Sequence, residues 1–321
     1  MPFTAKPWEV LRDPIEMNVV FHIGLHKTAS GTLQRQFFPA CKNVNTLTTS
    51  QDETRAFIRA ITKTDPAYFD GHQAAELLSP VMRDNQVNLI SNESISGPPY
   101  AGVVERELDH RSAILENVRN TFPDSRIVIV LRRQDALARS MYRQYVKRGG
   151  TARISTFYGF DMDDGVGMFS RNRFRYLPYI QLLNKLFPER VLVLLFEEFV
   201  KDKPAFLRRL CEFIGTDVPE LTMHAENAST LGPFGMEATR LANYFFQSML
   251  NRGPIPQIPR KQFGRWKRVS PIELLHDYWP GKGKPGKRIS DLCDRVLDEV
   301  RDDNRSLDRE FGPGLSRFDY Y

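Results

Sequence analysis

The sequence predicts an α/β protein with a central parallel sheet covered by helices on both faces. Apolar runs of strand type occur at 17–23, 87–91, 126–131 and 191–196, and each is followed by a helical pattern. Continuous apolar strands of this kind are buried on both sides, as in folds that alternate strands and helices. Ligands in such folds lie beyond the carboxyl ends of the strands, so those ends are where a site is expected.

Helices are expected at 30–38, 111–121, 135–147, 174–187 and 204–214. Asp135 is the expected N-cap of the third, while Gly149 and Gly215 follow the ends of the third and fifth. Near the C-terminus, apolar residues recur at helical spacing, which predicts a helix over about 289–310 that packs back on the sheet.

Composition excludes several classes of protein. The chain has 321 residues, 41% of them hydrophobic and 26% charged, which is typical of a globular protein and leads us to expect a single domain over 1–321. No apolar run approaches the ~18 residues of a membrane-spanning helix. The first residues show no signal-peptide pattern, so a cytoplasmic location is expected. Neither the three cysteines nor the six histidines have metal-ligand spacing, and no metal is expected.

The positive charge is concentrated in one segment. The net charge of the chain is +6, yet residues 252–288 hold ten basic residues, two acidic ones and six prolines. So many prolines disfavour regular structure through most of the segment, which predicts a long basic loop or lid. It is either a solvated surface connection or a flap that binds anions.

A loop rich in glycine and hydroxyl residues follows the first strand. Residues 22–34 read H-I-G-L-H-K-T-A-S-G-T-L-Q and lead directly into a helix. Backbone N–H groups at such a helix start point toward one anion, Thr28, Ser30 and Thr32 add hydroxyl donors, and Lys27 adds a charge. The loop is not a Walker A motif, because Ala29 stands where that motif has its second glycine, so a magnesium nucleotide is disfavoured.

A second anion site is expected after the strand at 126–131. Arg132 stands at the end of this strand, and Ser140 lies in the second turn of the following helix. If the Ser140 hydroxyl points back toward the strand ends, it forms a compact phosphate clamp with Arg132. The alternative is that Arg132 pairs with a carboxylate and Ser140 is an incidental helix residue.

Both motifs resemble those of sulfotransferases that use 3′-phosphoadenosine 5′-phosphosulfate (PAPS), especially bacterial ones. The resemblance implies a three-layer fold like that of P-loop NTPases, no metal, and PAPS as the sulfuryl donor. It implies that Gly24 and residues 27–32 (Lys27, Thr28, Ala29, Ser30, Gly31 and Thr32) hold the 5′-phosphosulfate, and that Arg132 and Ser140 hold the 3′-phosphate. The sequence departs from the family pattern at Ala29, usually Gly, and at Gly31, usually a hydroxyl residue.

The resemblance extends into the basic segment. Residues 282–286, K-G-K-P-G, are similar to a loop that closes over the 3′-phosphate and the adenosine in this family. Lys282, Gly283 and Lys284 are therefore expected to contact the donor.

Sulfuryl transfer needs positive charge at the leaving phosphate and a base for the acceptor proton. Lys27 fits the first role. Glu93, just after the strand at 87–91, is the first choice for the base, and His26 is its rival. His22, at the end of the first strand, is expected to be a packed core histidine.

The sequence therefore predicts a sulfotransferase that modifies a hydroxyl or amine of a small-molecule or carbohydrate acceptor, with a carbohydrate or glycoconjugate as the default by family analogy. Two alternatives are a P-loop-type small-molecule kinase and a non-enzymatic nucleotide- or polyanion-binding protein. No nucleic-acid partner is expected, because the basic segment matches no nucleic-acid-binding module.

Overall fold

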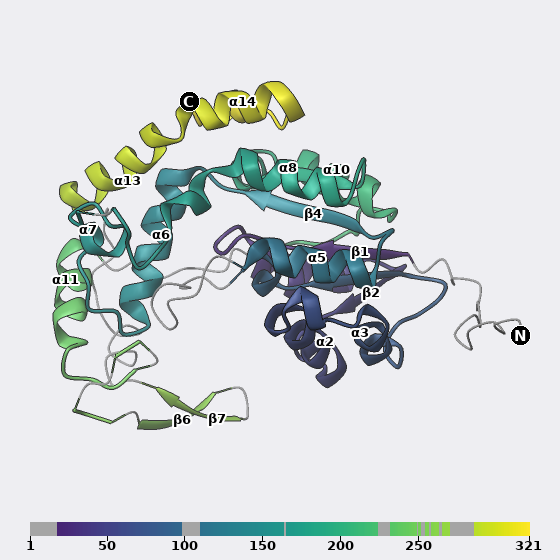
Figure 1. Cartoon of the computed structure of the whole chain (residues 1–321), viewed down its shortest axis with the longest axis horizontal. Helices are drawn as coiled ribbons and strands as arrows, with labels where there is room; N and C mark the ends of the chain where they lie inside the picture. Colours follow the sequence, from purple (N-terminus) through teal and green to yellow (C-terminus); the bar gives the residue numbers. More distant parts are fainter. Residues whose placement is uncertain are drawn as a thin grey trace, which may run out of the picture.

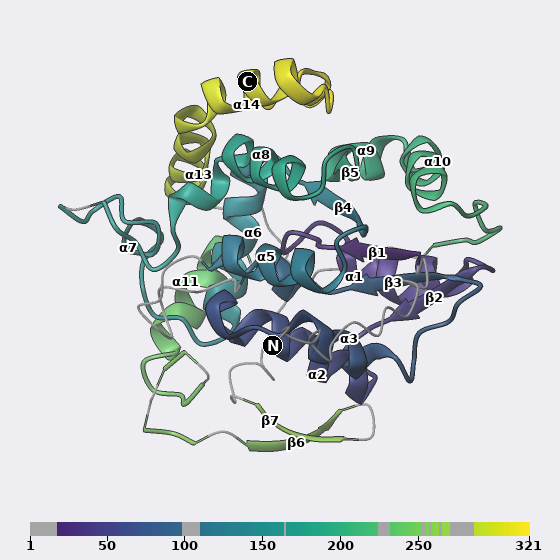
Figure 2. The same cartoon turned by 45° about the vertical axis from the view of Figure 1, so that its right-hand side comes forward.

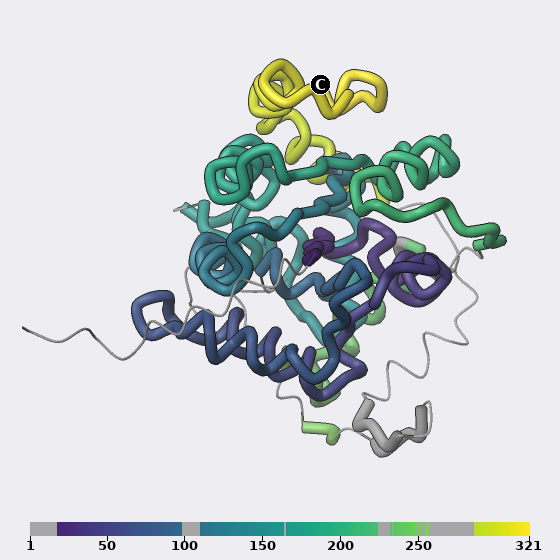
Figure 3. Tube along the Cα trace, turned by 90° about the vertical axis from the view of Figure 1, so that its right-hand side faces the viewer, coloured from purple at the N-terminus to yellow at the C-terminus, as the bar shows by residue number. Residues whose placement is uncertain are grey.

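The computed structural model describes residues 18–97, 110–163, 165–223, 232–248, 250–251, 254–256, 258–262, 265–269 and 286–321. A five-stranded parallel sheet forms its centre, in the order β2-β3-β1-β4-β5. The strands are β1 (Val19–His22), β2 (Val44–Leu47), β3 (Val87–Ser91), β4 (Arg126–Leu131) and β5 (Val191–Leu195). The chain builds the β2 side first and then crosses to the β4 side, so the topology switches at the central strand β1. Figure 3 shows the C-terminal segment, in yellow, at the upper edge of the molecule.

Alternate side chains of the strands pack on opposite faces of the sheet, which divides the core into two parts. Phe21, Ile90 and Ile129 face one part, and Val20 and Val130 face the other. The first part is covered by α2 (Asp52–Lys63), α3 (Gly71–Leu78), α5 (Arg111–Thr121), α6 (Gln134–Lys147) and α8 (Tyr176–Leu186). The second is covered by the turn after β1 and by α9 (Phe196–Lys201) and α10 (Lys203–Ile214). The predicted three-layer α/β fold is confirmed.

The C-terminal helices pack on other helices rather than on the sheet. The helix expected over 289–310 is divided at Val300 into α13 (Lys287–Glu299) and α14 (Arg301–Phe311). α13 contacts α6 and α14 contacts α8, so both lie at the outside of the molecule (Figures 1 and 2). The expectation that this segment packs on the sheet is wrong, because α6 and α8 already cover the face that it approaches.

Other elements complete the described chain. α7 (Ile154–Phe157) and α11 (Pro233–Ala242) follow α6 and α10 in the sequence. Within the basic segment, β6 (Ile258–Gln262) and β7 (Arg265–Val269) form an antiparallel hairpin, so part of a segment expected to be a loop has regular structure. Lys282, Gly283 and Lys284 lie outside the described residues. No helix within the described ranges is long and apolar enough to cross a bilayer.

Candidate active site

The loop after β1 folds tightly back on itself. Lys27 and Ala29 have positive φ angles of 70° and 64°, in the left-handed region. A Cβ atom on Gly24 would lie 2.3 Å from Ser30 Oγ, so a larger residue here would displace the Ser30 side chain. The Thr28 hydroxyl donates to the carbonyl of Leu25 at 2.6 Å, and this side chain is fully buried. Thr28 therefore stabilises the loop from inside rather than offering its hydroxyl to a ligand.

The helix expected over 30–38 changes type along its length. Only α1 (Ser30–Thr32) is α-helical; a π-helical turn follows over Leu33–Phe37 and a 3₁₀ turn over Phe38–Ala40. The side chains of Leu33 and Phe37 both pack into the core behind the loop. Wide turns of this kind are frequent at functional sites.

The second motif lies where β4 ends and α6 begins. Arg132 Nη1 donates to the carbonyl oxygen of Lys27 at 2.7 Å, so the two motifs are in direct contact across the sheet edge. The guanidinium also lies over the ring of Phe196, 4.5 Å from its centre. Asp135, the expected N-cap of this helix, instead lies inside its first turn and pairs with Arg133 Nε at 2.7 Å.

Residues of both motifs line one cleft of about 930 Å³. Its lining includes His26, Lys27, Ala29, Ser30, Gly31 and Thr32 from the loop, Glu93 after β3, and Arg132 and Ser140 from the second motif. The structure therefore brings together these predicted residues, at the carboxyl ends of β1, β3 and β4. Gly24 and Thr28 shape the loop but do not line the cleft.

Sequence reasoning missed three further cations that line this cleft: Arg35 in the turn after α1, Arg148 after α6 and Lys203 at the start of α10. Arg148 adjoins Lys147 at the end of α6, and Lys203 follows α9, but none of the three cations belongs to a recognisable motif.

Several positive charges line the cleft close to Lys27. Burial lowers the pKa of Lys27, the carboxylate of Glu93 opposes that change, and the positive charges of Arg148, Lys147 and Arg132 add to it. Burial likewise lowers the pKa of Arg132. Partly desolvated cations this close repel one another, so a bound anion would stabilise the group.

The two candidate bases form a hydrogen-bonded pair. Glu93 lies in a 3₁₀ turn after β3, and its Oε2 is 2.9 Å from Nδ1 of His26. Burial raises the pKa of the Glu93 carboxyl, but hydrogen bonds from His26 and Ser30 and the charges of His26 and Lys27 outweigh burial and leave the pKa below its usual value. An ionised carboxylate only accepts hydrogen bonds, so Nδ1 of His26 carries the proton in this pair.

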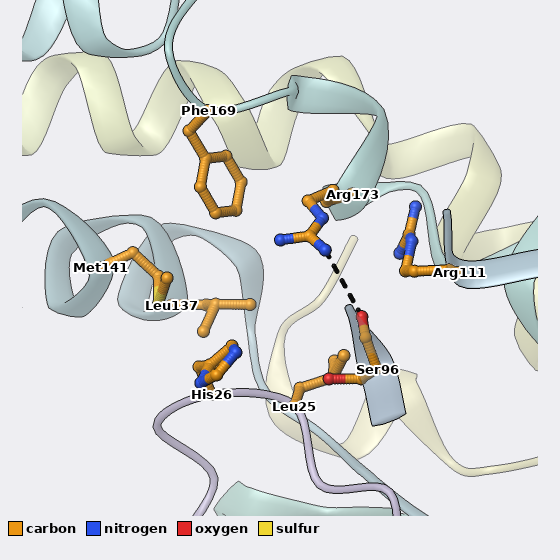
Figure 4. Close-up of a pocket in the computed structure, with 8 residues that line it drawn as sticks. All are labelled: Leu25, His26, Ser96, Arg111, Leu137, Met141, Phe169 and Arg173. Carbon is orange, nitrogen blue, oxygen red and sulfur yellow. Dashed lines mark hydrogen bonds between the residues drawn. The ribbon is translucent and has the colours of Figure 1, made fainter. Parts of the chain in front are cut away.

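His26 also borders a second, smaller pocket (Figure 4). The pocket has a volume of about 30 Å³, and its walls are mostly apolar. Leu25, His26, Ser96, Arg111, Leu137, Met141, Phe169 and Arg173 line it. Because the imidazole lines both spaces, the small pocket and the large cleft meet at this ring.

His22 is a core residue, as expected. It is fully buried, its Nδ1 lies 2.7 Å from Ser91 Oγ, and burial lowers its pKa to about 4. Within the described residues, no group of three or more His, Cys, Asp or Glu side chains is placed to hold a metal ion.

Comparison with protein-family models gives a match to the sulfotransferase family over residues 23–220, more than half of the chain. The chain belongs to the sulfotransferase family. The matched range contains Lys27, Glu93, Arg132 and Ser140 of this sulfotransferase and ends before the basic segment. A comparison with curated proteins finds no match.

Several solved structures of sulfotransferases are similar to the chain. One, from Alicyclobacillus acidocaldarius, is 20% identical over 65% of this chain and 86% of that chain, with a TM-score of 0.46. The mouse sulfotransferase SULT7A1 complexed with PAP is 13% identical over 92% of this chain and 88% of that chain, with a TM-score of 0.41. A sulfotransferase domain from the curacin biosynthetic pathway is 13% identical over 88% of this chain and 97% of that chain, with a TM-score of 0.38.

Proposed function

We propose that this sulfotransferase transfers the sulfuryl group of PAPS to a hydroxyl group of an acceptor. One observation carries the proposal: Lys27 and Arg132, from motifs 105 residues apart, line one cleft and are joined by a hydrogen bond, with Ser140 in the same lining. A ligand with anionic groups at two separate points fits two adjacent cationic motifs better than a ligand with one.

The residues in the cleft fit a doubly phosphorylated adenosine. Lys27, Ser30 and Thr32 would hold the 5′ end, and Arg132 and Ser140 the 3′-phosphate. Arg132 Nε is buried and has no hydrogen-bond partner among the described residues, so it could donate to an oxygen of a bound phosphate. The cleft volume of about 930 Å³ is large enough for a nucleotide.

PAPS would supply the sulfuryl group, whose sulfur bonds to the acceptor oxygen as its bond to the phosphate oxygen breaks. Lys27 places a positive charge where the leaving phosphate gains negative charge. The left-handed turn at Lys27 and Ala29 holds that charge at the edge of the cleft, so little rearrangement is needed when the donor binds.

His26 and Glu93 act together in this proposal. Glu93 holds Nδ1 of His26 and keeps its proton there. Nε2, which lies 3.4 Å from the carbonyl oxygen of Gly97, would leave this long contact to take the proton of the acceptor hydroxyl. Glu93 is then a positioning residue rather than the base itself. A His26→Asn variant should accordingly lose more of kcat than a Glu93→Gln variant, and the reverse order would assign the base to Glu93.

Ligand-induced stabilisation tests the proposal directly. 3′,5′-ADP (PAP) at 100 times its Kd should stabilise the folded chain by about 2.7 kcal/mol, whereas AMP, which lacks the 3′-phosphate, should stabilise it much less. The Ser140→Ala variant should weaken PAP binding about tenfold and leave AMP binding unchanged, because a hydrogen bond to a charged group contributes about 1.5 kcal/mol. Ser79→Ala, at the exposed end of α3, is the matched control.

Equal stabilisation by PAP and AMP would contradict the proposal. Transfer from labelled ATP but not from labelled PAPS would favour a kinase. Polyanion binding that falls steeply with salt, without transfer from either donor, would favour a binding protein.

A further inference from the structure

The small pocket beside His26 bears on the kind of acceptor, an inference that rests on the proposed function. The pocket lies between the loop after β1, α6 and the segment around Arg173 (Figure 4), and His26 lines both this pocket and the donor cleft. An acceptor hydroxyl has to contact the base on one side and the donor on the other, and His26 borders both spaces. The small pocket is thus the space beside the proposed base that remains for the acceptor when the donor occupies the large cleft.

Its size limits what enters. A water molecule needs roughly 10–15 Å³ when volume is measured in this way. The pocket, at about 30 Å³, therefore holds about two groups of that size, such as one carbon and one oxygen. A methylene arm that ends in a hydroxyl fits this space, whereas the carbon of a ring hydroxyl would bring two further carbons into it.

The apolar side chains in the pocket walls also favour a methylene arm. Leu25, Leu137, Met141 and Phe169 offer apolar contacts suited to a methylene group. Leu137 and Met141 are almost fully buried on α6, where close packing leaves them little freedom to move aside.

The polar part of the wall disfavours a cation. Arg111 and Arg173 contribute guanidinium groups, which carry positive charge and only donate hydrogen bonds, whatever else they contact. In Figure 4 the guanidinium of Arg173 lies across the pocket from the imidazole of His26. A protonated amine entering this space would meet repulsion from Arg173, and no carboxylate among the lining residues would offset that repulsion, whereas a neutral hydroxyl meets no such repulsion.

We propose that this pocket receives the hydroxyl-bearing methylene arm of the acceptor, so that the enzyme sulfates primary alcohols and discriminates against secondary hydroxyls and amines. The hydroxyl proton passes to Nε2 of His26 as the oxygen bonds to sulfur and the bond between sulfur and the phosphate oxygen breaks, with 3′,5′-ADP as the leaving group. A sugar is an acceptor under this proposal through an exocyclic CH₂OH group rather than through its ring hydroxyls.

Matched acceptor pairs test the proposal with labelled PAPS. Glucose and xylose differ by the exocyclic CH₂OH group; pentan-1-ol and pentan-2-ol differ in the position of the hydroxyl. We expect kcat/KM to be at least tenfold higher for the primary alcohol of each pair, and the sulfate on glucose to be found at its primary hydroxyl by mass spectrometry and NMR. Pentan-1-amine should be a poorer acceptor than pentan-1-ol.

A variant that enlarges the pocket provides the second test. Met141→Ala should raise the ratio of kcat/KM for pentan-2-ol over that for pentan-1-ol by about tenfold or more, since one or two carbons in a pocket change discrimination by that amount. Leu183→Ala is the matched control, because Leu183 is equally buried on α8 but does not line the pocket. If Met141→Ala does not fold, Leu137→Ala removes side-chain atoms from the same wall.

The outcomes separate the two proposals. If PAP does not stabilise the chain more than AMP does, the proposed function fails. If PAP binds as expected but secondary hydroxyls or amines are sulfated as fast as primary ones, or no primary alcohol is sulfated at all, the assignment of this pocket is overturned and the donor site stands. A change of the same size in Leu183→Ala would also overturn it.

Discussion

At the scale of single residues, Lys27 lies where a charge is costly without an anion. Burial lowers the pKa of Lys27 most, and the charges of Arg148 and Arg132 lower it further. The carboxylate of Glu93 offsets only part of this lowering. The positive charge is therefore most useful when negative charge develops on the phosphate during transfer. Lys27→Ala should lower kcat about 100-fold or more, in the range found when one electrostatic donor to a transition state is removed.

The same substitution should affect ground-state binding much less. Arg132, Ser140 and the loop backbone would still hold the nucleotide, so PAP affinity measured by calorimetry should fall less than tenfold. Lys63→Ala, an exposed cation at the end of α2 outside the cleft, is the control for loss of one positive charge. Near-normal kcat in Lys27→Ala with PAPS and a true acceptor would rule out this role.

Ala29 is one of the two residues at which the sequence departs from the family pattern, and its backbone conformation is costly for an alanine. Its φ of 64° and ψ of 12° place it in the left-handed region, which an alanine adopts at a cost of roughly 1–2 kcal/mol. Ala29→Gly should raise the free energy of unfolding by about 1 kcal/mol in urea titrations. Ala56→Gly, on the exposed side of α2, should lower it by about 0.5–1 kcal/mol, so the two changes have opposite signs. A loss of stability in Ala29→Gly would contradict the left-handed turn.

At the scale of elements, apolar runs predict the strands that are rich in apolar residues, whereas a strand interrupted by polar residues is missed. β3 and β4 have the predicted bounds, because most of their residues are apolar and buried on both faces. β2 was not predicted, since Asn45 and Thr46 interrupt its apolar character; Asn45 is stabilised by donating to Asn88 Oδ1 at 2.9 Å, a contact that no local pattern indicates.

The presence of a helix was easier to predict than the point at which the helix changes type or breaks. The spacing of apolar residues along the chain shows neither the change of helix type at Leu33–Phe37 nor the break at Val300. α2 was also missed, although its buried residues Thr54, Phe57, Ile58 and Ile61 have the spacing of an amphipathic helix.

The attachment of α14 to α6 depends on a buried pair of amides. Gln134 Nε2 donates to Asn304 Oδ1 at 2.7 Å, and Asn304 Nδ2 donates to Gln134 Oε1 at 3.2 Å and to the carbonyl of Tyr320 at 2.8 Å. Both side chains are fully buried, so removal of one leaves the other without its partner. Asn304→Ala should lower the free energy of unfolding by about 2 kcal/mol.

A double-mutant cycle checks that the pair acts as a unit. The combined Asn304→Ala and Gln134→Ala variant should be more stable than the sum of the two single losses implies, with an interaction energy of about 1 kcal/mol. Strict additivity would show that the two amides contribute independently.

At the scale of the whole molecule, the position of the candidate site could be predicted from the sequence because each motif directly follows a parallel strand. Lys27, Glu93 and Arg132 follow β1, β3 and β4, which are neighbours in the sheet, so their strand ends meet at one edge. The hydrogen bond between His26 and Glu93 was not predictable, because it depends on the direction of two side chains 67 residues apart. Arg148 and Lys203 reach the cleft from helix ends, whose position depends on the packing of α6 and α10.

The buried histidine at the end of β1 makes the stability of the whole fold sensitive to acid. Burial lowers the pKa of His22 to about 4 in the folded chain, from an ordinary value of 6.5. Above pH 6.5 neither state binds the proton, and His22 has no effect on stability. Between pH 6.5 and pH 4 the unfolded chain binds it and the folded chain does not, so the free energy of unfolding falls as the pH falls. The loss reaches about 3 kcal/mol at pH 4, at about 1.36 kcal/mol for each unit of pKa difference.

Urea titrations at pH 7, 6, 5 and 4.5 measure this slope. The His22→Asn variant should be less stable than the natural chain at pH 7, because the contact with Ser91 Oγ is altered, yet its stability should fall less between pH 6.5 and pH 4.5. His72→Gln, at an exposed position on α3, should retain the full slope. Equal slopes for His22→Asn and the natural chain would mean that His22 is protonated in the folded state over this range, and that the core around β1 admits a charge that its burial should exclude.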